Sequence, residues 1–273
     1  MPSTVDGILE LNRFVLDGLP SDDGVAPGKI RTFEVGVAGY RGAPSEDCEH
    51  LLLQLCNLMN RLRPPADDMR IAFGIIRAIA SHVYMAMIHP FGDGNGRTAR
   101  LVELQALLGC GVPMVAAHLL SNHYNMTRSE YYRQLSKASK TQEGVWPFIE
   151  YAVRGLVDGL DAQIETIRKH QRNVAWRDHV YQQFRDKRSP ADHRRRRVAL
   201  KLGEEKKAVS VKDICNLSAD ISRDYAGKTT KTLTRDMNAL ADQQLIVRVE
   251  GGKVRANLHQ LNAFFPRRRR TAK

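Results

Sequence analysis

Cysteine is scarce in this 273-residue chain, and none of its four cysteines forms a C-x-x-C pair. They stand far apart, at Cys48, Cys56, Cys110 and Cys215. This spacing is unlike a disulfide framework or a cysteine-rich zinc site, so we expect free thiols in a reducing compartment. The first six residues also lack the basic and apolar regions of a signal peptide. Together these absences predict a cytoplasmic protein.

A long apolar run without charge is missing as well. The most apolar stretch, residues 71–88, is interrupted by Arg77 and His82. A helix of this length and composition is typical of a protein core rather than of a membrane span. We therefore expect no membrane partner.

Acidic residues are in deficit, but only in the second half of the chain. The sequence has 42 Lys and Arg against 30 Asp and Glu, a net charge of +12. Residues 161–273 hold 27 basic and 13 acidic side chains, and residues 1–160 hold the other 15 and 17. This asymmetry predicts a near-neutral N-terminal domain and a basic C-terminal one. A basic surface can be merely solvated or can contact nucleic acid, and charge alone leaves both open.

The spacing of apolar residues predicts a mainly α-helical N-terminal part. Helical periodicity covers residues 5–19, the stretch from Ser45 to Pro64, residues 67–88 and the segments 101–108, 129–138 and 146–185. Residues 29–44 instead show an apolar alternation broken by glycines, which predicts a short β-hairpin.

After Pro190 the pattern changes to shorter elements. We expect helices over residues 191–202, from Ser210 onward and over 229–243, followed by a hairpin over 245–257. Three short helices and a hairpin are typical of a winged helix-turn-helix, in which the third helix enters the major groove of DNA. The predicted organisation is thus a first domain at 1–160, a helical linker at 161–188, a winged helix-turn-helix at 189–265 and a basic tail at 266–273. DNA is a candidate partner of residues 189–273.

Between two of the predicted core helices lies the segment HPFGDGNGRTAR, residues 89–100. The amides of Gly94, Asn95 and Gly96 can approach an anion closely, and the helix that starts near Asn95 adds its dipole. Arg97 and Arg100 are three residues apart, so they share one helix face and can stabilise several phosphates at once. The segment therefore predicts a phosphate site at the start of a helix.

Two further residues of this segment carry chemistry. Asp93 stands among cationic groups, where an acid usually holds Mg²⁺ that bridges phosphate oxygens. His89 can take a proton from an attacking hydroxyl near neutral pH. Taken singly, a lone histidine is more often structural and a D-G-N-G sequence is more often a turn. Taken together, these residues predict transfer of a phosphate-containing group from a nucleotide to a hydroxyl.

The segment resembles the signature of the Fic family, H-x-F-x-D/E-G-N-G-R-x-x-R. Every specified position is filled, by His89, Phe91, Asp93, Gly94, Asn95, Gly96, Arg97 and Arg100. The similarity spans roughly residues 5–160 and includes residues 28–44, which resemble the hairpin called the flap. It implies an all-helical Fic core with a small β-hairpin flap at about 29–44.

The resemblance also implies an activity, that of a protein adenylyltransferase. Such an enzyme transfers AMP from ATP to a Ser, Thr or Tyr hydroxyl of a target protein docked on the flap, and it releases pyrophosphate. By this resemblance His89 is the general base, Asp93 is the Mg²⁺ ligand and Phe91 anchors the loop. The residues implied to bind the nucleotide are Gly92, Asp93, Gly94, Asn95, Gly96, Arg97, Thr98, Ala99, Arg100, Tyr131, Tyr132 and Val35. For either tyrosine, packing in the core is an equal alternative.

Alternatives to this activity stay open at the level of sequence. The motif is compatible with transfer of another nucleotide monophosphate or of phosphocholine. A kinase branch of the family has lost the second glycine and the arginine spacing, both of which are kept here. An alternative of another class is that the protein is a DNA-binding transcriptional regulator whose Fic domain senses nucleotide.

Many Fic proteins carry an inhibitory helix, [S/T]-x-x-x-E-[G/N], whose glutamate pairs with the second motif arginine, here Arg100. Upstream, Asp6-Gly7 has Pro2 where Ser or Thr is needed. Residues 139–144 fit the letters but lie between predicted core helices. We therefore expect the chain as written to be uninhibited, with inhibition supplied by a removed segment or by a separate partner.

Overall fold

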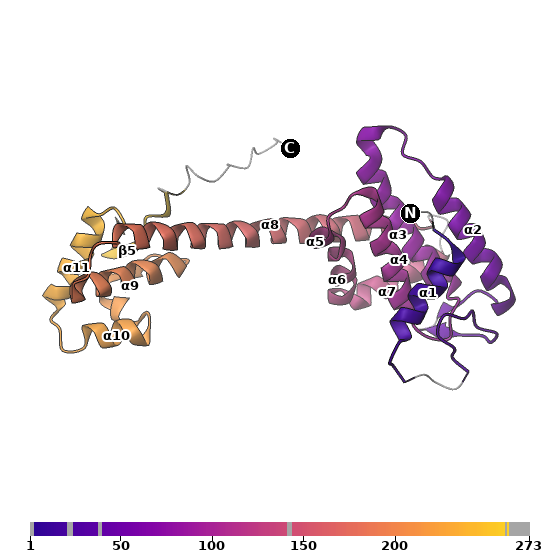
Figure 1. The fold of residues 1–273 in the computed structure, drawn as a ribbon, viewed down its shortest axis with the longest axis horizontal. Coiled ribbons are helices and arrows are strands. Elements are labelled where there is room, and N and C mark those ends of the chain that lie inside the picture. Colours follow the sequence, from indigo (N-terminus) through magenta and orange to yellow (C-terminus); the bar gives the residue numbers. More distant parts are fainter. Residues whose placement is uncertain (1–2, 21–23, 38–39, 141–143, 260, 262–273) are drawn as a thin grey trace. The chain divides into compact units, whose positions relative to one another are not determined.

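The computed structural model describes residues 3–20, 24–37, 40–140, 144–259 and 261. The chain divides into two compact units, Met1–Gln163 and Ile164–Lys273, and the division falls within one long helix, α8 (Figure 1). Most of the described residues are helical, with a two-stranded and a three-stranded sheet. The expectation of a mainly α-helical chain is confirmed.

The N-terminal unit is built on two adjacent helices, α3 (Arg70–Ile88) and α4 (Asn95–Cys110), which the segment 89–94 connects. A Cβ added at Gly74 would lie 2.3 Å from the Cβ of Cys110. The backbone of α3 at Gly74 is therefore in direct contact with the Cys110 side chain of α4. The remaining elements are α1 (Val5–Leu16), the hairpin β1 (Gly36–Val37) and β2 (Tyr40–Arg41), η1 (Ser45–Asp47), α2 (Cys48–Arg61), η2 (Asp67–Met69), α5 (Met114–Ala117), α6 (Leu119–Met126), α7 (Arg128–Lys140) and the first part of α8 (Trp146–Gln183).

Helix α3 separates two apolar cores. On one side it packs with α4, α6, α7 and α8 around buried residues such as Ile79, Leu120 and Phe148. On the other side it packs with α1 and α2, and there Leu52 and Phe91 are buried. By length and composition the stretch Asp67–Ile88 could also cross a membrane, but 44% of its most apolar window is buried within the fold. Its packing on both sides is that of a core helix.

The C-terminal unit contains the end of α8 and a small helical domain with an antiparallel sheet. Its elements are α9 (Pro190–Glu204), β3 (Val209–Ser210), η3 (Val211–Asn216), α10 (Ala219–Tyr225), α11 (Thr230–Asp242), β4 (Ile246–Val249) and β5 (Lys253–Ala256). The strand order is β3-β5-β4, with Ser210 paired to Lys253 and Arg248 paired to Val254.

The helix predicted to start at Ser210 is a short 3₁₀ helix and not an α-helix. Ser210 ends β3 and is the N-cap position of η3, although its side chain makes no capping hydrogen bond. The α-helix α10 begins at Ala219, where the side chain of Ser218 accepts the amide of Ile221 at 3.3 Å. Both serines are good N-cap residues, so their identity alone does not decide between them.

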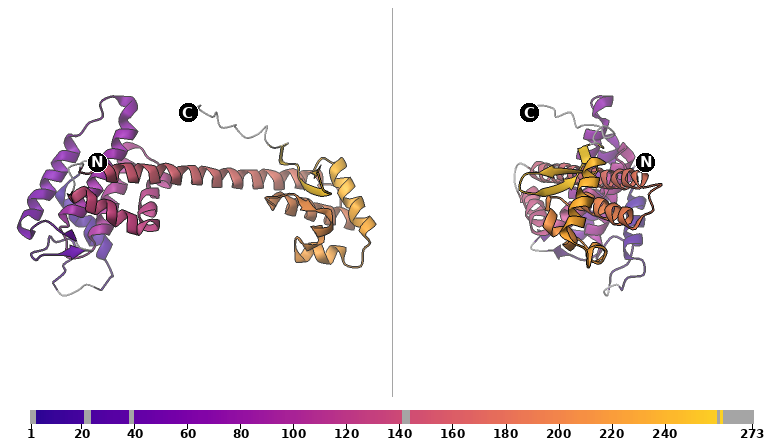
Figure 2. Two further views of the ribbon diagram at one scale, coloured as in Figure 1. Left: turned by 180° about the vertical axis from the view of Figure 1, so that it is seen from behind. Right: turned by 90° about the vertical axis from the view of Figure 1, so that its left-hand side faces the viewer.

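The end of α8 is part of the C-terminal core. Trp176, Val180 and Phe184 lie within the segment predicted as a linker, yet all three side chains are buried. The indole Nε1–H of Trp176 donates to the carbonyl oxygen of Ala199 at 3.0 Å, and α9 lies alongside this end of α8 (Figure 2). Only the middle of α8 therefore lies outside both cores.

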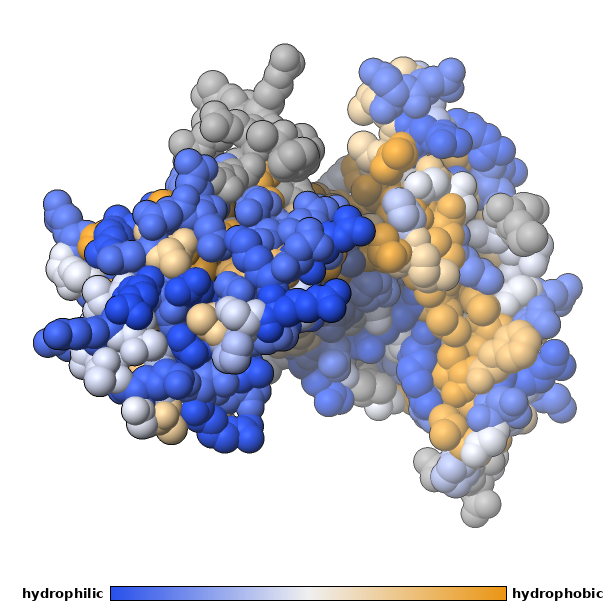
Figure 3. Space-filling model, turned by 60° about the vertical axis from the view of Figure 1, so that its left-hand side comes forward, coloured by the Kyte–Doolittle hydropathy of each residue, from blue (hydrophilic) through white to orange (hydrophobic). Residues whose placement is uncertain are grey.

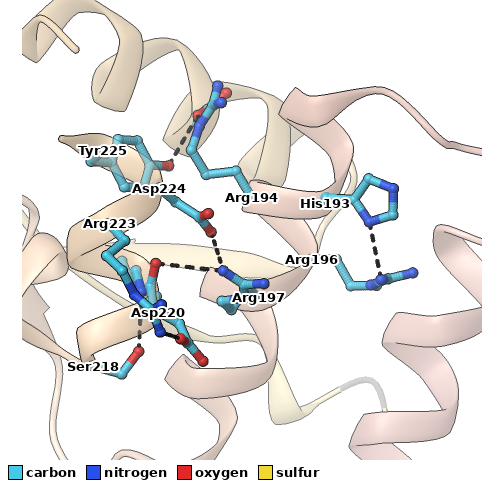
Figure 4. Close-up of polar contacts among 11 residues, drawn as sticks. His193, Arg194, Arg196, Arg197, Ser218, Asp220, Arg223, Asp224 and Tyr225 are labelled. Atoms are coloured by element: carbon cyan, nitrogen blue, oxygen red, sulfur yellow. Dashed lines mark hydrogen bonds and ion pairs between the residues drawn. The ribbon is translucent and has the colours of Figure 1, made fainter. Parts of the chain in front are cut away.

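A buried carboxylate connects three helices of this unit. Asp236 on α11 is 1% exposed and accepts hydrogen bonds from Arg194 Nε (2.8 Å), Arg195 Nε (2.7 Å) and the hydroxyl of Tyr225 (3.0 Å). Arg194 lies on α9 and Tyr225 on α10, and Figure 4 shows the ends of their side chains lying close together. The neighbouring Arg197 pairs with Asp224 at 2.7 Å. Three arginines of the run 194–197 are thus occupied by structural contacts.

Candidate functional site

His89 ends α3 in a left-handed conformation, with φ 53° and ψ 55°. This conformation is uncommon for a residue other than glycine, and it turns the chain out of α3 into the loop. The Nδ1 atom of His89 lies 3.1 Å from the carbonyl oxygen of Ala86. Because a carbonyl only accepts, Nδ1 holds the proton of the neutral ring, and Nε2 keeps its lone pair. Burial lowers the pKa of His89 below its ordinary value, so the imidazole is neutral near pH 7.

The loop after His89 is closed by the side chain of Asn95. Its Oδ1 accepts the amide of Phe91 at 2.9 Å, and its Nδ2 donates to the carbonyl oxygen of Phe91 at 2.7 Å. The ring of Phe91 is 1% exposed and belongs to the core beside α1 and α2. The Asn95 side chain therefore shapes the loop, and only its backbone amide remains as a group for an anion.

A second asparagine, Asn12 on α1, holds the same loop from outside the motif. It is fully buried, and its Nδ2 donates to the carbonyl oxygen of Asp93 (3.0 Å) and to Oγ1 of Thr98 (3.2 Å). Its Oδ1 accepts the amide of Gly28 at 2.9 Å. A Cβ at Gly94 would lie 2.9 Å from Asn12 Nδ2, and Gly94 has φ +80°, so this position requires glycine on two grounds. Nothing in the sequence distinguishes Asn12 from the other polar residues of the predicted amphipathic helix 5–19.

Asp93 lies on the outer side of the loop with its side chain 57% exposed. One carboxylate oxygen accepts the Gly94 amide at 2.5 Å, and the other pairs with Arg97 Nη2 at 2.8 Å. Within the described residues no group of three or more His, Cys, Asp or Glu forms a metal cluster. A single carboxylate fits Mg²⁺ only when phosphate oxygens and water complete its shell, which is how Mg²⁺ commonly binds nucleotides.

The start of α4 is open to an anion. The first turn of a helix leaves amides without an intrahelical acceptor, and here that turn contains Asn95, Gly96 and Arg97. A Cβ added at Gly96 would meet no atom of the described residues within 4 Å, so a ligand can approach its backbone. Arg100 lies one turn further on, and its Nε is buried without a hydrogen-bond partner among the described residues. An unpaired buried donor on a cation at this place fits an anionic ligand.

Arg31, at the start of the flap, ties the flap to the motif. Its side chain is almost fully buried, and its guanidinium donates to the carbonyl oxygens of His89 (2.8 Å), Phe33 (2.7 Å) and Ala43. Its own amide donates to the carbonyl oxygen of Pro90 at 2.9 Å. This role could not be predicted from the sequence, because an arginine in a loop gives no sign that its partners are backbone carbonyls.

Below Arg100 lies a buried polar group that the sequence also did not reveal. Glu103, on α4, accepts the hydroxyl of Tyr124 at 2.8 Å, and its other oxygen lies 3.6 Å from Nδ1 of His82. The Nε2 of His82 lies 3.0 Å from the hydroxyl of Tyr131. Burial raises the pKa of Glu103 to about 8 and lowers that of His82 to about 3, so both groups are neutral at pH 7. Among the described residues, Arg100 is the charged group that acts on both Glu103 and His82.

The other predicted nucleotide residues lie in different environments. Thr98 and Ala99 are fully buried on the inner face of α4, and Tyr131 is 4% exposed within the aromatic core. These burials favour packing over ligand contact for the three side chains, although the Arg100 guanidinium lies 6.0 Å from the Tyr131 ring centroid. Tyr132 and Val35 are half-buried and stay predictions.

Gly92 lies under the loop that leads into the flap. A Cβ there would approach Val25 Cγ2 to 2.9 Å and Phe33 Cζ to 3.1 Å.

Two predicted features fall on residues that the structure does not describe. Of the candidate inhibitory motif 139–144, residues 141–143 lie outside the described residues, as does the basic tail 266–273.

Comparison with known proteins agrees with this geometry. Residues 2–107 match the family model of the Fic/DOC family. The protein adenylyltransferase fic-1 of Caenorhabditis briggsae is 32% identical over 172 residues, which are 63% of this chain and 31% of that protein. The fic-1 protein of Caenorhabditis elegans is 30% identical over 172 residues, 63% of this chain and 30% of that protein. The chain therefore spans about a third of the length of these curated relatives.

A solved structure extends the likeness in fold. The crystal structure of a Fic family protein from Desulfovibrio desulfuricans G20 superimposes with a TM-score of 0.52, covering 94% of this chain and 69% of that one. The two sequences are 18% identical, so this likeness concerns the fold alone. The matches assign a Fic/DOC family domain to the N-terminal unit.

Proposed function

We propose that the chain, through its Fic/DOC family domain, is a protein adenylyltransferase that transfers AMP from ATP to a Ser, Thr or Tyr hydroxyl of a target protein. The observation that carries this proposal is the state of His89. Its Nδ1–H is held by Ala86 and its ring is neutral, so Nε2 is ready to accept a proton beside an open helix start. The relatives named protein adenylyltransferase support the same activity.

In the proposed reaction the target hydroxyl attacks the α-phosphorus of ATP. The bond from that phosphorus to the oxygen shared with the β-phosphate breaks, and pyrophosphate leaves with its electron pair. Nε2 of His89 takes the hydroxyl proton, which makes the oxygen a better nucleophile. The amides of Gly94, Asn95 and Gly96 stabilise the negative charge on the α-phosphate.

The two arginines and Asp93 serve the rest of the triphosphate. Arg97 and Arg100 would hold the β- and γ-phosphates, and Arg100 would gain the hydrogen bond that its Nε lacks. Asp93 would hold Mg²⁺, which when bound neutralises phosphate charge. The side chains of Asp93 and Arg97 are 57% and 45% exposed, so their mutual ion pair is weak enough to yield to a nucleotide.

The flap is proposed to bind the target. The hairpin β1–β2 is short, and strand addition next to Val35 would place a target segment along its edge. The Arg31 side chain donates to the carbonyl oxygens of His89 and Ala43. It therefore connects the hairpin that would bind the target to the residue that would act as the base. A separate inhibitory partner would act by offering a carboxylate to Arg100.

We also infer that the C-terminal unit is a winged helix-turn-helix. Three helices, α9, α10 and α11, precede the strands β4 and β5, and β3 completes a sheet in the order β3-β5-β4. The exposed side of α11 carries Lys231, Thr234, Arg235 and Asn238, which are side chains suited to phosphates and base edges. The face of this unit in the left foreground of Figure 3 is largely hydrophilic.

Contact with DNA through α11 has a direct test. Loss of Lys231 and Arg235, as K231A/R235A, should weaken binding of duplex DNA and lower the slope of log affinity against log salt by roughly 2. A regulator that only senses nucleotide is not favoured, because the motif is complete and the relatives are named as transferases. An unchanged salt slope would remove DNA as a partner of this surface.

The transferase activity is tested by mass spectrometry of a lysate incubated with the full chain and ATP. The expected product is AMP added to Ser, Thr or Tyr of a protein, absent with His89→Ala. Addition of phosphate alone to the target, or of another nucleotide monophosphate when all four nucleoside triphosphates are supplied, would contradict AMP transfer.

A further inference from the structure

The buried face of α1 contains a polar side chain. This face consists of Ile8, Asn12 and Leu16, which follow one another at intervals of four residues. An apolar side chain between Ile8 and Leu16 would fill the position without the cost of burying polar atoms. Asn12 is instead fully buried, and its three hydrogen bonds reach segments 16, 81 and 86 residues away. Such bonding indicates a role beyond packing.

The hydrogen bond to Asp93 fixes the direction of the peptide unit between Asp93 and Gly94. Asn12 Nδ2 holds the carbonyl oxygen of Asp93 at 3.0 Å on the buried side of the loop. Because the carbonyl and the amide of a planar trans peptide point in opposite directions, the Gly94 amide is directed outward. Its partner agrees with this direction, since it donates to the Asp93 carboxylate, whose side chain is 57% exposed.

Thr98 extends this control to the next peptide unit. Its hydroxyl accepts a hydrogen bond from Asn12 Nδ2 at 3.2 Å and donates to the carbonyl oxygen of Gly94 at 2.9 Å. Thr98 is fully buried, so the Gly94 carbonyl also points inward. The amide of Asn95 therefore points the opposite way, out of the start of α4. One buried side chain thus directs two consecutive amides of the proposed phosphate site.

Glycine at position 94 makes such a constraint necessary. Gly94 has φ +80°, and glycine adopts positive and negative φ at similar cost, so the peptide unit before it can reverse. In the reversed orientation the carbonyl oxygen of Asp93 would face a bound phosphate and repel it. Asn12 opposes the reversal, because its Nδ2 needs an acceptor and the reversed peptide would present a donor.

We propose that Asn12 is a positioning residue of the transfer reaction, which selects the peptide orientation in which the amides of Gly94 and Asn95 face the α-phosphate. Because it is fully buried, Asn12 itself contacts neither nucleotide nor target. The role rests on the proposed AMP transfer, since that reaction is what places an α-phosphate at these amides. Asn12 Oδ1 also accepts the amide of Gly28 at 2.9 Å, so the same side chain holds the start of the flap.

Asn12→Leu tests the role in the reaction, because leucine is similar in size and has no polar side-chain atom. The amides of the site stabilise charge that develops on the α-phosphate, whereas Arg97 and Arg100 are proposed to hold the distal phosphates. The kcat of AMP transfer should therefore fall by roughly 10- to 100-fold, while KM for ATP should change by less than about threefold. Rates are measured under conditions in which urea unfolding shows the variant to be folded. A folded variant with an unchanged kcat, or with a raised KM alone, would overturn the proposal.

Asn60→Ala is the matched control for the loss of a connecting amide. The Asn60 side chain, on α2, accepts the amide of Ser3 and donates to the carbonyl oxygen of Ser3, both at 2.8 Å. Its loss should lower the urea midpoint and leave kcat unchanged. An equal fall of kcat in Asn60→Ala and Asn12→Leu would show that any loosening of the unit slows transfer, and would contradict a specific role of Asn12.

Asn12→Asp tests the peptide orientation without any reaction. A carboxylate only accepts hydrogen bonds, so it cannot hold the carbonyl oxygen of Asp93. It can accept the Gly28 amide, the Thr98 hydroxyl and, once the peptide has reversed, the Gly94 amide. Three such donors favour the charged form of a buried carboxylate, so the variant is expected to fold with the reversed peptide.

A crystal structure of Asn12→Asp should show the Gly94 amide turned inward, toward the new carboxylate. A peptide that keeps its direction in this variant would overturn the proposal. This outcome is separate from the failure of the proposed function. If the unaltered chain transfers no AMP, the proposed reaction is wrong, and the crystal structure still decides whether Asn12 sets the direction of the peptide.

Discussion

Nδ1 of His89 lies 3.1 Å from the carbonyl oxygen of Ala86, one turn back along α3. This single contact fixes the tautomer, because the carbonyl can only accept. It leaves Nε2 as the basic atom of a half-buried imidazole at the mouth of the motif loop.

The pH dependence of labelling follows from this state. Burial lowers the pKa of His89, so the ring is already neutral at pH 7 and gains protons only in more acidic solution. The rate of AMP transfer should be flat from pH 7 to 8 and should fall only at a pH more acidic than the one at which an ordinary histidine titrates. Initial rates at constant ionic strength measure this. A rate that keeps climbing above pH 7 would assign the titration to another group.

Replacement of Arg31 should uncouple the flap from His89. R31M leaves three carbonyl oxygens without their charged donor, so we expect a loss of roughly 2–4 kcal/mol in unfolding free energy. Transfer measured well below the unfolding transition should fall as well, because the His89 backbone loses a fixed contact. Urea unfolding measures the loss of unfolding free energy, and labelling measures the loss of AMP transfer.

The control for Arg31 is R41M in the same hairpin. Arg41 is 78% exposed and pairs with Glu34 at 3.3 Å, so its loss should change stability by less than about 1 kcal/mol. Equal effects of R31M and R41M would contradict the role given to Arg31.

Glu103 should make the stability of the N-terminal unit depend on pH. Its folded pKa of about 8 lies above the ordinary value, so the folded state holds a proton that the unfolded state releases. Stability from this group is therefore greatest below about pH 4.5 and is lost as pH rises toward 8. The groups facing it are His82, Arg100, Tyr124 and Tyr131.

E103Q removes this titration and keeps the shape. The variant should gain stability relative to the unaltered chain as pH rises from 5.5 to 7.5, which urea unfolding at the two pH values measures. A difference that does not change with pH would show that Glu103 is ionised in the folded protein.

Asp236 should be essential to the C-terminal unit. D236N leaves Arg194 and Arg195 without their shared carboxylate, and breaking a buried pair from one side costs about 3–5 kcal/mol. The control D220N removes an exposed pair with Arg223 and should cost less than about 1 kcal/mol. The near-ultraviolet signal of Trp176, buried in this core, reports the transition.

The motif and the helices around it could be predicted because their information is local. His89, Asp93 and Gly94 stand within six residues, and the flanking helices show their period directly. Asn12 and Arg31 could not be predicted, since most of their partners are backbone groups that only folding brings near. Buried ion pairs could not be predicted for the same reason.

The ion pairs of arginines 194–197 could not be predicted from the sequence. In the sequence they form a basic run of the kind that contacts nucleic acid, yet Asp236 and Asp224 occupy three of them. The carboxylates that neutralise the run lie 27 to 42 residues away along the chain, beyond any local pattern. Cations better placed for a ligand are Lys231 and Arg235 on the exposed side of α11.

The most direct test is labelling of a lysate with ATP that carries ³²P at either the α- or the γ-phosphate, with and without the full chain. Addition of the chain should produce a protein band labelled from α-³²P-ATP, His89→Ala should not produce it, and the γ-³²P pattern of the lysate's own kinases should stay the same. New γ-label on addition of the chain, or an α-labelled band that His89→Ala also produces, would contradict AMP transfer.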